Sequence, residues 1–453
     1  MTDATGLRDR YAVVGIGLSR FGKVPGTSAI GFCLESAKRA IEDCGIARDE
    51  IDGVLVLMPP QMGEQHGWAS RVAAFLGITP AFCATMDMGG ASPIGMMQTA
   101  VAVLAAGFCR AVLCTFGCQN NPMGVIPQLF GSPFAIPYGD VGAIMMQTAV
   151  AVLAAGFCRA VLCTFGCQNN PMGVIPQLFG SPFAIPYGDV GAITFMGHLA
   201  RRQMHEHGIT STDYGHIAVQ WRKHAATNPD AQMRKPMTLE DHQNSRLINA
   251  PLHLFDCCLF TDGGGAFIVT STERARDLKQ TPALISGLGQ VHSSEVIRPH
   301  DDGRGGGSEA GERVFRMAGC RPADIDVAQL YDAFTPRVVH DLVAYGFAAW
   351  EEVGPLAAAG ELTVGGRLPC NTAGGLLSEG HLSGMGHVAE AVRQVRGTSR
   401  CQVPDAELSM ATGYGGARTN RPRPWPTRPQ SSAGHDRARR PDRRDPHPPC
   451  RGG

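Results

Sequence analysis

Apolar residues recur at helical spacing on almost every side of one stretch, residues 86–113. A Gly-Gly-Ala-Ser turn opens this stretch, and Met97, Ala100, Val101 and Leu104 then follow at i, i+3 and i+4 with apolar residues between them. The pattern predicts a helix that is buried on nearly every face. The glycines would let a ligand approach the unpaired N–H groups at the helix start, so an acyl oxygen could be held there. A core helix with a glycine entry turn explains the pattern without any ligand.

The same succession of elements occurs twice along the chain. Strand, helix, turn and strand follow one another over residues 11–60 and again over 283–336. The turn Gly45–Asp52 (GIARDEID) lines up with Gly319–Asp326 (GCRPADID), and the glycine pair before the buried helix corresponds to the pair at 374–375. Strands separated by helices at this spacing predict a parallel sheet covered by helices, built as two similar halves that pack together.

A second repeat is literal. Met96–Ile144 and Met145–Ile193 are identical over 49 residues. Because an ancient repeat diverges in sequence, an identical copy indicates a recent tandem duplication or an assembly error. The first copy keeps its natural entry and the second copy keeps its natural exit. We therefore expect the first helix and strand to occupy the core, and about 49 residues between Phe116 and Phe165 to be extruded or poorly packed.

We divide the chain into a first half at 1–275, which includes an inserted region, a second half at 276–416 and a tail at 417–453. The tail holds ten Arg, eight Pro and three Asp, a composition that cannot bury a core and predicts disorder. It is interpreted either as an anion-binding arm or as out-of-frame translation of GC-rich DNA. The second interpretation predicts that the second half has lost the strand expected after Gly416, which would leave a sheet edge open.

Composition and charge restrict the classes of protein that remain. The 453 residues are 44% hydrophobic and 18% charged, as in ordinary globular proteins. Of the 40 basic and 40 acidic residues, the tail holds ten and three, so the body is mildly acidic and gives no sign of nucleic-acid binding. The apolar run Ala100–Cys109 is far shorter than the ~20 residues of a membrane span, and the N-terminus lacks the apolar core of a signal peptide. We expect a cytoplasmic protein with reduced cysteines and no membrane contact.

Three longer motifs carry a family resemblance. They are LFDCCLFTDGGGAFIVTSTERARDL at 254–278, YDAFTP at 331–336 and NTAGGLLSEGHLSGMGHVAEAVRQVRG at 371–397. These motifs resemble the thiolase superfamily, and within it the lipid-transfer-protein or sterol-carrier-type thiolase-like group. The resemblance covers about Tyr11 to Gly416 and implies an α/β fold, a five-layered αβαβα double domain of two similar halves that is usually dimeric. It also implies a CoA thioester over the N-termini of the two buried helices, with no metal and no cofactor beyond the CoA of the substrate.

The two cysteines of that family are missing. Gly90 stands where the family's Cys-Ala-Ser-Gly turn has its nucleophile, and Ala411 stands where a Cys-x-Gly turn has the second thiol. A thiolase needs the first sulfur at a helix N-terminus, where its pKa is lowered and where it carries the acyl group. The nearest thiols in sequence, Cys83 and Cys109, are predicted on a strand and at the far end of the helix. Ser92 is a substitute nucleophile by position, although a serine at a helix start is usually an N-cap.

Two positions of the family site survive. His381 matches the histidine of a Gly-His-Pro motif, which the resemblance implies donates a hydrogen bond to the thioester carbonyl and stabilises an enolate. Tyr331 replaces the Asn of an Asn-Glu-Ala-Phe motif, where a phenol can hydrogen-bond an oxygen or, with its pKa lowered by neighbours, exchange a proton. A structural histidine and a buried strand tyrosine are the alternatives. The resemblance adds Asp332 to the catalytic candidates. The candidates for substrate binding are Gly90, Ser92, Asn371, Gly375 and Gly413.

The chemistry that remains without the cysteines is C–C cleavage without an acyl-enzyme. The sequence resembles the thiolase-like aldolases of steroid side-chain degradation, which implies retro-aldol cleavage of a β-hydroxyacyl-CoA, with the CoA enolate held by His381 and backbone N–H groups such as that of Gly90. Those enzymes work with a small OB-fold partner, so we expect such a heteromer as well as a homodimer. Two alternatives stay open. One is an acyltransferase with an unrecognised nucleophile, and the other is a non-catalytic acyl-CoA- or lipid-binding protein, or a defective one.

Overall fold

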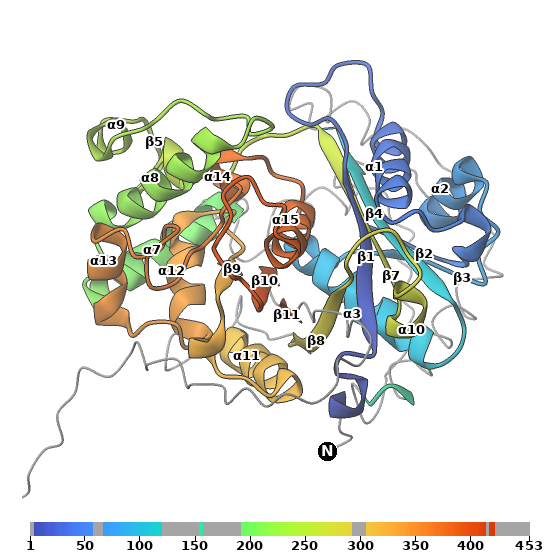
Figure 1. Cartoon of the computed structure of the whole chain (residues 1–453). Coiled ribbons are helices and arrows are strands. Elements are labelled where there is room, and N and C mark those ends of the chain that lie inside the picture. Colours follow the sequence, from blue (N-terminus) through green and yellow to red (C-terminus); the bar gives the residue numbers. More distant parts are fainter. Residues whose placement is uncertain are drawn as a thin grey trace, which may run out of the picture. The chain divides into compact units, whose positions relative to one another are not determined.

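The computed structural model describes residues 4–57, 67–119, 154–156, 192–291, 305–413 and 416–421. Within these residues the main sheet has nine strands in the order β3-β2-β4-β7-β1-β8-β11-β10-β9 (Figure 1). The strands of this sheet are β1 Tyr11–Leu18, β2 Gly53–Leu57, β3 Phe82–Met86, β4 Ala111–Cys118, β7 Gly263–Ser271, β8 Ala283–Gln290, β9 Val327–Gln329, β10 Ser409–Gly413 and β11 Gly416–Arg421. A separate hairpin pairs β5 Leu247–Asn249 with β6 Leu252–His253.

The helices named below have the following bounds. They are α1 Ala29–Cys44, α2 Trp68–Leu76, α3 Ser92–Ala105, α7 Ala192–His207, α8 Ser211–Thr227, α9 Leu239–Gln243, α10 Thr272–Ala275, α11 Gly305–Ala318, α12 Thr335–Ala344, α13 Trp350–Ala358, α14 Gly375–Ser378 and α15 Met385–Arg396. None of the helices in the described parts of the chain is both long and apolar enough to span a membrane.

The two halves of the sheet repeat one pattern. In the first half, β2 is parallel to β3 and β4, while β7 is antiparallel to β4 and β1. In the second half, β9 is parallel to β10, while β11 is antiparallel to β10 and β8. A parallel bridge between Ala328 and Cys370 takes the place of the β2–β3 ladder. The half-sheets join where Ala12 and Val13 of β1 pair with Leu284 and Ala283 of β8. The predicted construction from two similar halves is confirmed.

Two details of the sheet differ from the sequence-based prediction. The sheet is mixed rather than parallel, because β7 enters after a long inserted region, and the spacing of elements does not fix the direction of a strand that follows such an insertion. The expected loss of the closing strand after Gly416 is also wrong. Residues 416–421 form β11, which pairs with both β10 and β8. Ladder hydrogen bonds use backbone groups, so an unusual side-chain composition does not prevent them.

The helices complete five layers. On one side α1 packs on β1, β4 and β7, and α2 packs on β2 and β3. On the other side α11 packs on β8 and β11. Between the half-sheets lie α3 and α15, each of which contacts strands of both halves. The order is therefore α, β, α, β, α, as the resemblance implied. The two central helices begin close to each other, since a Cβ at Gly384, the N-cap of α15, would lie 3.6 Å from Pro93 Cγ in α3.

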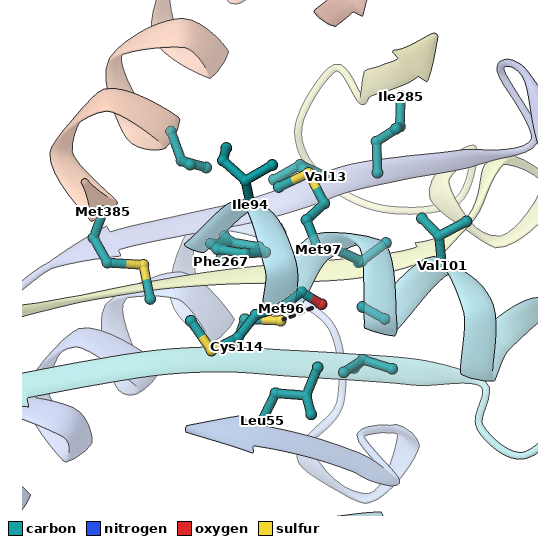
Figure 2. Packing of buried hydrophobic residues seen from close by; sticks show 14 of the residues in the cluster. Val13, Leu55, Ile94, Met96, Met97, Val101, Cys114, Phe267, Ile285 and Met385 are labelled. Atoms are coloured by element: carbon teal, nitrogen blue, oxygen red, sulfur yellow. Dashed lines mark hydrogen bonds between the residues drawn. The ribbon is translucent and has the colours of Figure 1, made fainter. Parts of the chain in front are cut away.

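The central helix α3 has the burial that its apolar pattern predicts. Twelve of its 14 residues are buried, and Pro93 in its first turn has no N–H to leave unpaired. Met97 and Val101 pack in one cluster with Leu55 and Phe267 (Figure 2). The first copy of the exact repeat thus supplies a core helix and the core strand β4, as expected. Most of the second copy, and with it the predicted extrusion, lies outside the described residues.

The inserted region covers the second half. Here α8 packs on α9, α12, α13 and α14, and α7 packs on α12. Thr210 caps α8 because its hydroxyl accepts the N–H of Asp213 while the Asp213 carboxylate bonds back to Thr210. The end of α8 and the segment after it run beside α14. The inserted region is therefore positioned to contact the loop between α14 and α15.

Candidate active site

The turn before α3 is closed by Ser92. Its Oγ accepts the N–H of Met88 at 2.8 Å and donates to the carbonyl of Gly89 at 2.8 Å. Ser92 is fully buried and is the first residue of the helix, so the expected N-cap position is wrong by one residue, and Ala91 is the N-cap. Both bonds of the hydroxyl hold the turn, which gives Ser92 a structural position rather than that of an activated nucleophile.

The phenol of Tyr331 occupies the side-chain space of residue 90. A Cβ placed on Gly90 with ideal geometry would lie 2.0 Å from both Cζ and Oη of Tyr331. Two further glycines allow this close packing, because a Cβ at Gly413 would lie 2.7 Å from the Gly90 carbonyl oxygen and one at Gly384 would lie 3.5 Å from Tyr331 Cε2. The tyrosine hydroxyl therefore stands where a cysteine side chain at position 90 would begin.

The backbone N–H groups of this turn differ in whether they are already hydrogen-bonded. Ala91 N–H bonds the Met88 carbonyl at 3.1 Å and Gly89 N–H bonds Asp87 Oδ1 at 3.2 Å. The N–H of Gly90 has no hydrogen-bond partner among the described residues. Gly90 is partly exposed and Gly89 is exposed, so a ligand can reach this donor. The N–H of Gly90 is therefore the donor of this turn that stays available for the acyl oxygen that the sequence predicts here.

Tyr331 is buried and only 6% exposed. Its N–H bonds Thr412 Oγ1 at 2.8 Å, and its hydroxyl lies 3.5 Å from Nε2 of His381. Burial raises the pKa of the phenol, and the neighbouring Cys258 thiol and Asp332 carboxylate raise it further. The prediction that neighbours lower this pKa is therefore wrong. At neutral pH the phenol keeps its proton and acts as a hydrogen-bond donor.

His381 faces the phenol from the loop between α14 and α15. Its backbone N–H bonds Thr261 Oγ1 at 2.8 Å. Burial lowers the pKa of the imidazole to about 4, although the nearby Asp332 carboxylate acts in the opposite direction. A neutral imidazole at neutral pH has one nitrogen that donates and one that accepts a proton. The structure thus brings the two surviving family positions, Tyr331 and His381, together.

Asp332 lies behind these two residues rather than beside a substrate. Its carboxylate is fully buried and accepts the N–H groups of Leu376 at 2.9 Å and Leu377 at 3.2 Å. Oδ1 also lies 2.9 Å from Nε2 of His387. A Cβ at Gly375 would overlap Oδ2, so that glycine permits the approach of the carboxylate. These contacts make Asp332 and Gly375 supports of the loop that carries His381.

Asn371 is also used internally. Its Oδ1 accepts the N–H of Leu330 at 2.7 Å and its Nδ2 donates to the Leu330 carbonyl at 2.8 Å. The residue is fully buried with a φ of 47°. Nε2 of His387 lies 2.9 Å from the same carbonyl. Asn371 and His387 thus both contact the backbone of Leu330, the residue before Tyr331. The side-chain amide of Asn371, which was predicted to bind substrate, bonds this backbone instead.

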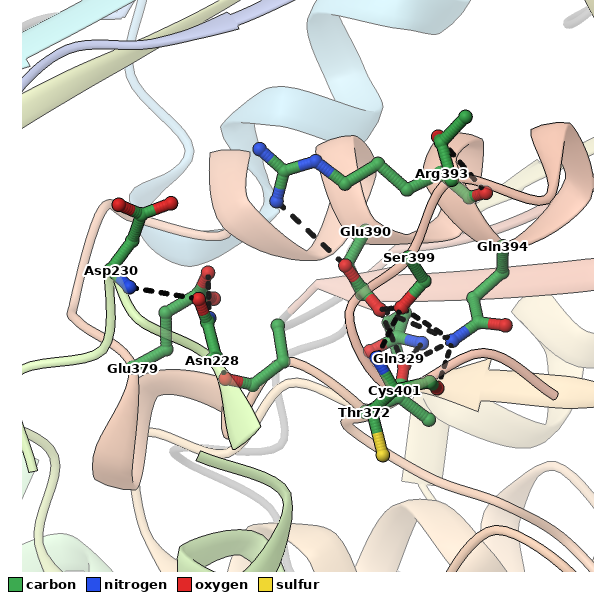
Figure 3. A network of polar contacts seen from close by, with 12 residues as sticks. Asn228, Asp230, Gln329, Thr372, Glu379, Glu390, Arg393, Gln394, Ser399 and Cys401 are labelled. Carbon is green, nitrogen blue, oxygen red and sulfur yellow. Dashed lines mark hydrogen bonds and ion pairs between the residues drawn. The ribbon is translucent and has the colours of Figure 1, made fainter. Parts of the chain in front are cut away.

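Sequence reasoning did not single out several residues of this site. Thr261 holds His381 and lies inside the quoted motif at 254–278, so the motif contained the signal. Glu379, two residues before His381, is a buried carboxyl whose pKa is raised to about 7, mainly by burial. Its Oε1 accepts from Asn228 Nδ2 at 3.2 Å (Figure 3). Farther along α15, Figure 3 shows Glu390 bonded to Thr372, a separate network that anchors the helix.

Cys258 and Cys109 are thiols rather than thiolates at neutral pH. Burial raises the pKa of Cys258, near Tyr331, to about 12, and that of Cys109 to about 12. Among the residues that the structure describes, no three His, Cys, Asp or Glu side chains gather as a metal site. The arrangement instead offers a neutral imidazole, a protonated phenol and a free backbone N–H. These groups can move one proton and stabilise one oxyanion.

Comparisons with known proteins show which family the chain resembles over most of its length. A family model described as thiolase C-terminal domain-like matches residues 289–421. The steroid side-chain-cleaving aldolase of Thermomonospora curvata is 37% identical over 417 residues, which cover 90% of this chain and 96% of that protein. The 17-hydroxy-3-oxo-4-pregnene-20-carboxyl-CoA lyase of Mycobacterium tuberculosis is 34% identical over 421 residues, which cover 91% of this chain and 98% of that protein.

Solved structures give the same result. The Ltp2-ChsH2(DUF35) aldolase is 34% identical with a TM-score of 0.75, over 92% of this chain and 98% of that chain. Human mitochondrial 3-ketoacyl-CoA thiolase is 16% identical with a TM-score of 0.62, over 92% of this chain and 99% of that chain. At that identity the human enzyme supports a shared fold alone.

Proposed function

The chain belongs to the thiolase superfamily, in its lipid-transfer-protein or sterol-carrier-type thiolase-like group, and we propose that it is a lyase that cleaves β-hydroxyacyl-CoA thioesters by a retro-aldol reaction. One observation carries this proposal. The phenol of Tyr331 fills the space of a side chain at Gly90, so the position of the superfamily's nucleophile holds a proton donor. A covalent acyl-enzyme has no place to form there, whereas a proton relay and an oxyanion donor are both present.

In the reaction one proton leaves the β-hydroxyl of the substrate and one proton is returned to its Cα. The Tyr331 hydroxyl accepts the proton of the β-hydroxyl while it passes its own proton to neutral His381, 3.5 Å away. The Cα–Cβ bond breaks, its electron pair moves into the thioester as an enolate, and the hydroxyl carbon becomes a ketone. The N–H of Gly90 stabilises the enolate oxygen. The relay then returns the proton to Cα, which releases a shortened acyl-CoA.

The substrate class follows from the relatives. Of the two relatives described above, one is named a steroid side-chain-cleaving aldolase and the other a lyase of a 17-hydroxy-3-oxo-4-pregnene-20-carboxyl-CoA. We therefore propose a steroid CoA thioester with a β-hydroxyl on the ring system. In this proposal the cleavage takes place in the cytoplasm and uses no cofactor beyond the CoA of the substrate.

We further propose a partner protein and a second copy of the chain. The similar solved aldolase contains ChsH2(DUF35), which supports a small partner of that kind, expected to have an OB fold. The strand β3 ends the sheet, and its residues Cys83, Ala84 and Met86 are partly exposed. An edge strand of this kind offers backbone groups to another chain, which supports pairing into a homodimer.

The test uses the purified full chain, alone and with a DUF35-type partner. It is incubated with a steroid β-hydroxyacyl-CoA, and the release of ketone and short acyl-CoA is followed by liquid chromatography and mass spectrometry. Cleavage without any mass change of the protein is the expected result. A covalent acyl adduct after incubation with acyl-CoA would support acyl transfer instead. Binding of CoA thioester without either reaction would identify a non-catalytic protein.

A further inference from the structure

His381 lies in the loop between α14 and α15 and belongs to neither a helix nor a strand. The inserted region holds it from one side, since the N–H groups of Gln232 and Met233 bond the carbonyls of Glu379 and Ser378 at 3.0 Å each. Arg222, buried at the core-facing side of α8, donates from Nε to Ser378 Oγ at 3.0 Å. The segment after α8 thus runs along the start of the loop, and leaves the backbone of His381 to be held by another group.

That group is the hydroxyl of Thr261, which lies just before β7 and is fully buried. Its Oγ1 accepts the backbone N–H of His381 at 2.8 Å and the side-chain Nε2 of Gln232 at 2.5 Å. The same Gln232 also lies against Gly380, where a Cβ would be 3.1 Å from Nε2. Because Oγ1 of Thr261 accepts hydrogen bonds from two separate segments, it fixes the position of the His381 backbone.

We infer that Thr261, held by Gln232, is the positioning residue that sets the imidazole of His381 against the phenol of Tyr331. This inference rests on the proposed function, because it assigns the proton transfer to these two side chains. Neither Thr261 nor Gln232 is given a role in bond breaking. Their effect is on the distance over which the proton moves.

The geometry makes this distance sensitive. Nε2 of His381 and Oη of Tyr331 are 3.5 Å apart, which is the outer limit of a hydrogen bond. Proton transfer needs about 2.6–3.2 Å between the heavy atoms, so the pair must tighten when substrate binds. A loop that drifts outward by a few tenths of an ångström loses the contact. Misplacement of about 1 Å costs roughly 100-fold in rate.

The main experiment compares Thr261→Val, which keeps the shape and removes the hydroxyl, with Thr261→Ser, which keeps the hydroxyl. We expect Thr261→Val to lower kcat roughly 10–100-fold with KM near that of the wild type. Thr261→Ser should retain most of the activity, and Gln232→Leu should lower kcat in the same way but less. The matched control is Thr270→Val on β7, because Thr270 is fully buried and donates to the Arg110 carbonyl at 2.7 Å, away from the site. It should lower the unfolding temperature and leave kcat unchanged.

A second measurement does not depend on activity. Hydrogen–deuterium exchange of peptides that span residues 378–384 reports the His381 N–H bond, which should exchange faster in Thr261→Val than in Thr261→Ser. If exchange is faster in Thr261→Val but the wild-type protein cleaves no substrate, the proposed function is wrong. The role of Thr261 in positioning His381 is then still supported. Unchanged exchange, or a Thr261→Val protein with full kcat, would overturn the inference.

Discussion

A single methyl group at residue 90 should disable the site. In Gly90→Ala the new Cβ would lie 2.0 Å from Oη and Cζ of Tyr331, whereas non-bonded atoms of this kind rest at about 3.5 Å. The ring must therefore retreat by about 1.5 Å or the turn must open. Overpacking of this kind costs about 1–3 kcal/mol of stability. A displacement of this size moves the hydroxyl from its position relative to His381, 3.5 Å away in the wild type, so kcat should fall by roughly 100-fold or more.

The assay measures retro-aldol cleavage and urea unfolding on the same preparations. Gly6→Ala is the control, because a Cβ there meets no atom within 4 Å. In the double variant Gly90→Ala/Tyr331→Ala the methyl finds space, so the two stability losses should not add. The free energy of unfolding of the double variant should be close to that of Tyr331→Ala, and the double variant should remain inactive. If Gly90→Ala keeps both its stability and its kcat, the phenol does not occupy this space and the proposed relay is wrong.

The other predictions concern the same groups. Tyr331→Phe keeps the ring, so unfolding should change little while kcat falls by roughly 10²–10⁴; an unchanged kcat would make Tyr331 a structural residue. His381→Ala removes the group that takes the proton of Tyr331, so kcat should fall by roughly 10²–10⁴ with little change in KM, and a change confined to KM would contradict this. Gly90→Cys should give no thiolysis of β-ketoacyl-CoA, since the sulfur must displace Tyr331 and Ala411 supplies no second thiol; CoA-dependent thiolysis by this variant would disprove it. Glu379→Gln tests pH dependence. Burial raises the pKa of the Glu379 carboxyl in the folded chain to about 7, so between about pH 4.5 and 7 the folded chain binds more protons than the unfolded chain. The stability of the wild type should therefore fall as the pH rises through that window. The glutamine variant should lack this fall and gain up to about 3 kcal/mol relative to wild type at pH 8, measured by urea unfolding at pH 5 and pH 8.

The elements set by local pattern could be predicted from the sequence. The apolar spacing of Met97 and Val101 gave the buried helix, and the two matching turns at 45–52 and 319–326 gave the paired halves. The direction of β7 could not be predicted, because its neighbours in the sheet are more than 140 residues away in the chain. The closing strand β11 was missed for a different reason, since its pairing depends on the backbone of β8 and β10 rather than on its own composition.

The site was predicted in part. The family motifs brought out Tyr331 and His381, and the structure places them together. Motifs do not separate a side chain that faces substrate from one that bonds the backbone, so Asp332 and Asn371 were assigned alike and both are internal supports. The raised pKa of Tyr331 depends on burial, which a motif does not state. Thr261 is 120 residues from His381, and only the fold joins them.

The contact between Gly90 and Tyr331 also restricts how such a site can evolve. Thiolases of this superfamily have a cysteine at the first position and an asparagine at the second. A chain with both the cysteine and the tyrosine would place two side chains in one volume and would fold poorly. A lineage that moves between the two chemistries one substitution at a time must therefore pass through glycine with asparagine. On such a route the thiol is lost before the phenol is gained, and a return to thiolase chemistry has to lose the phenol first.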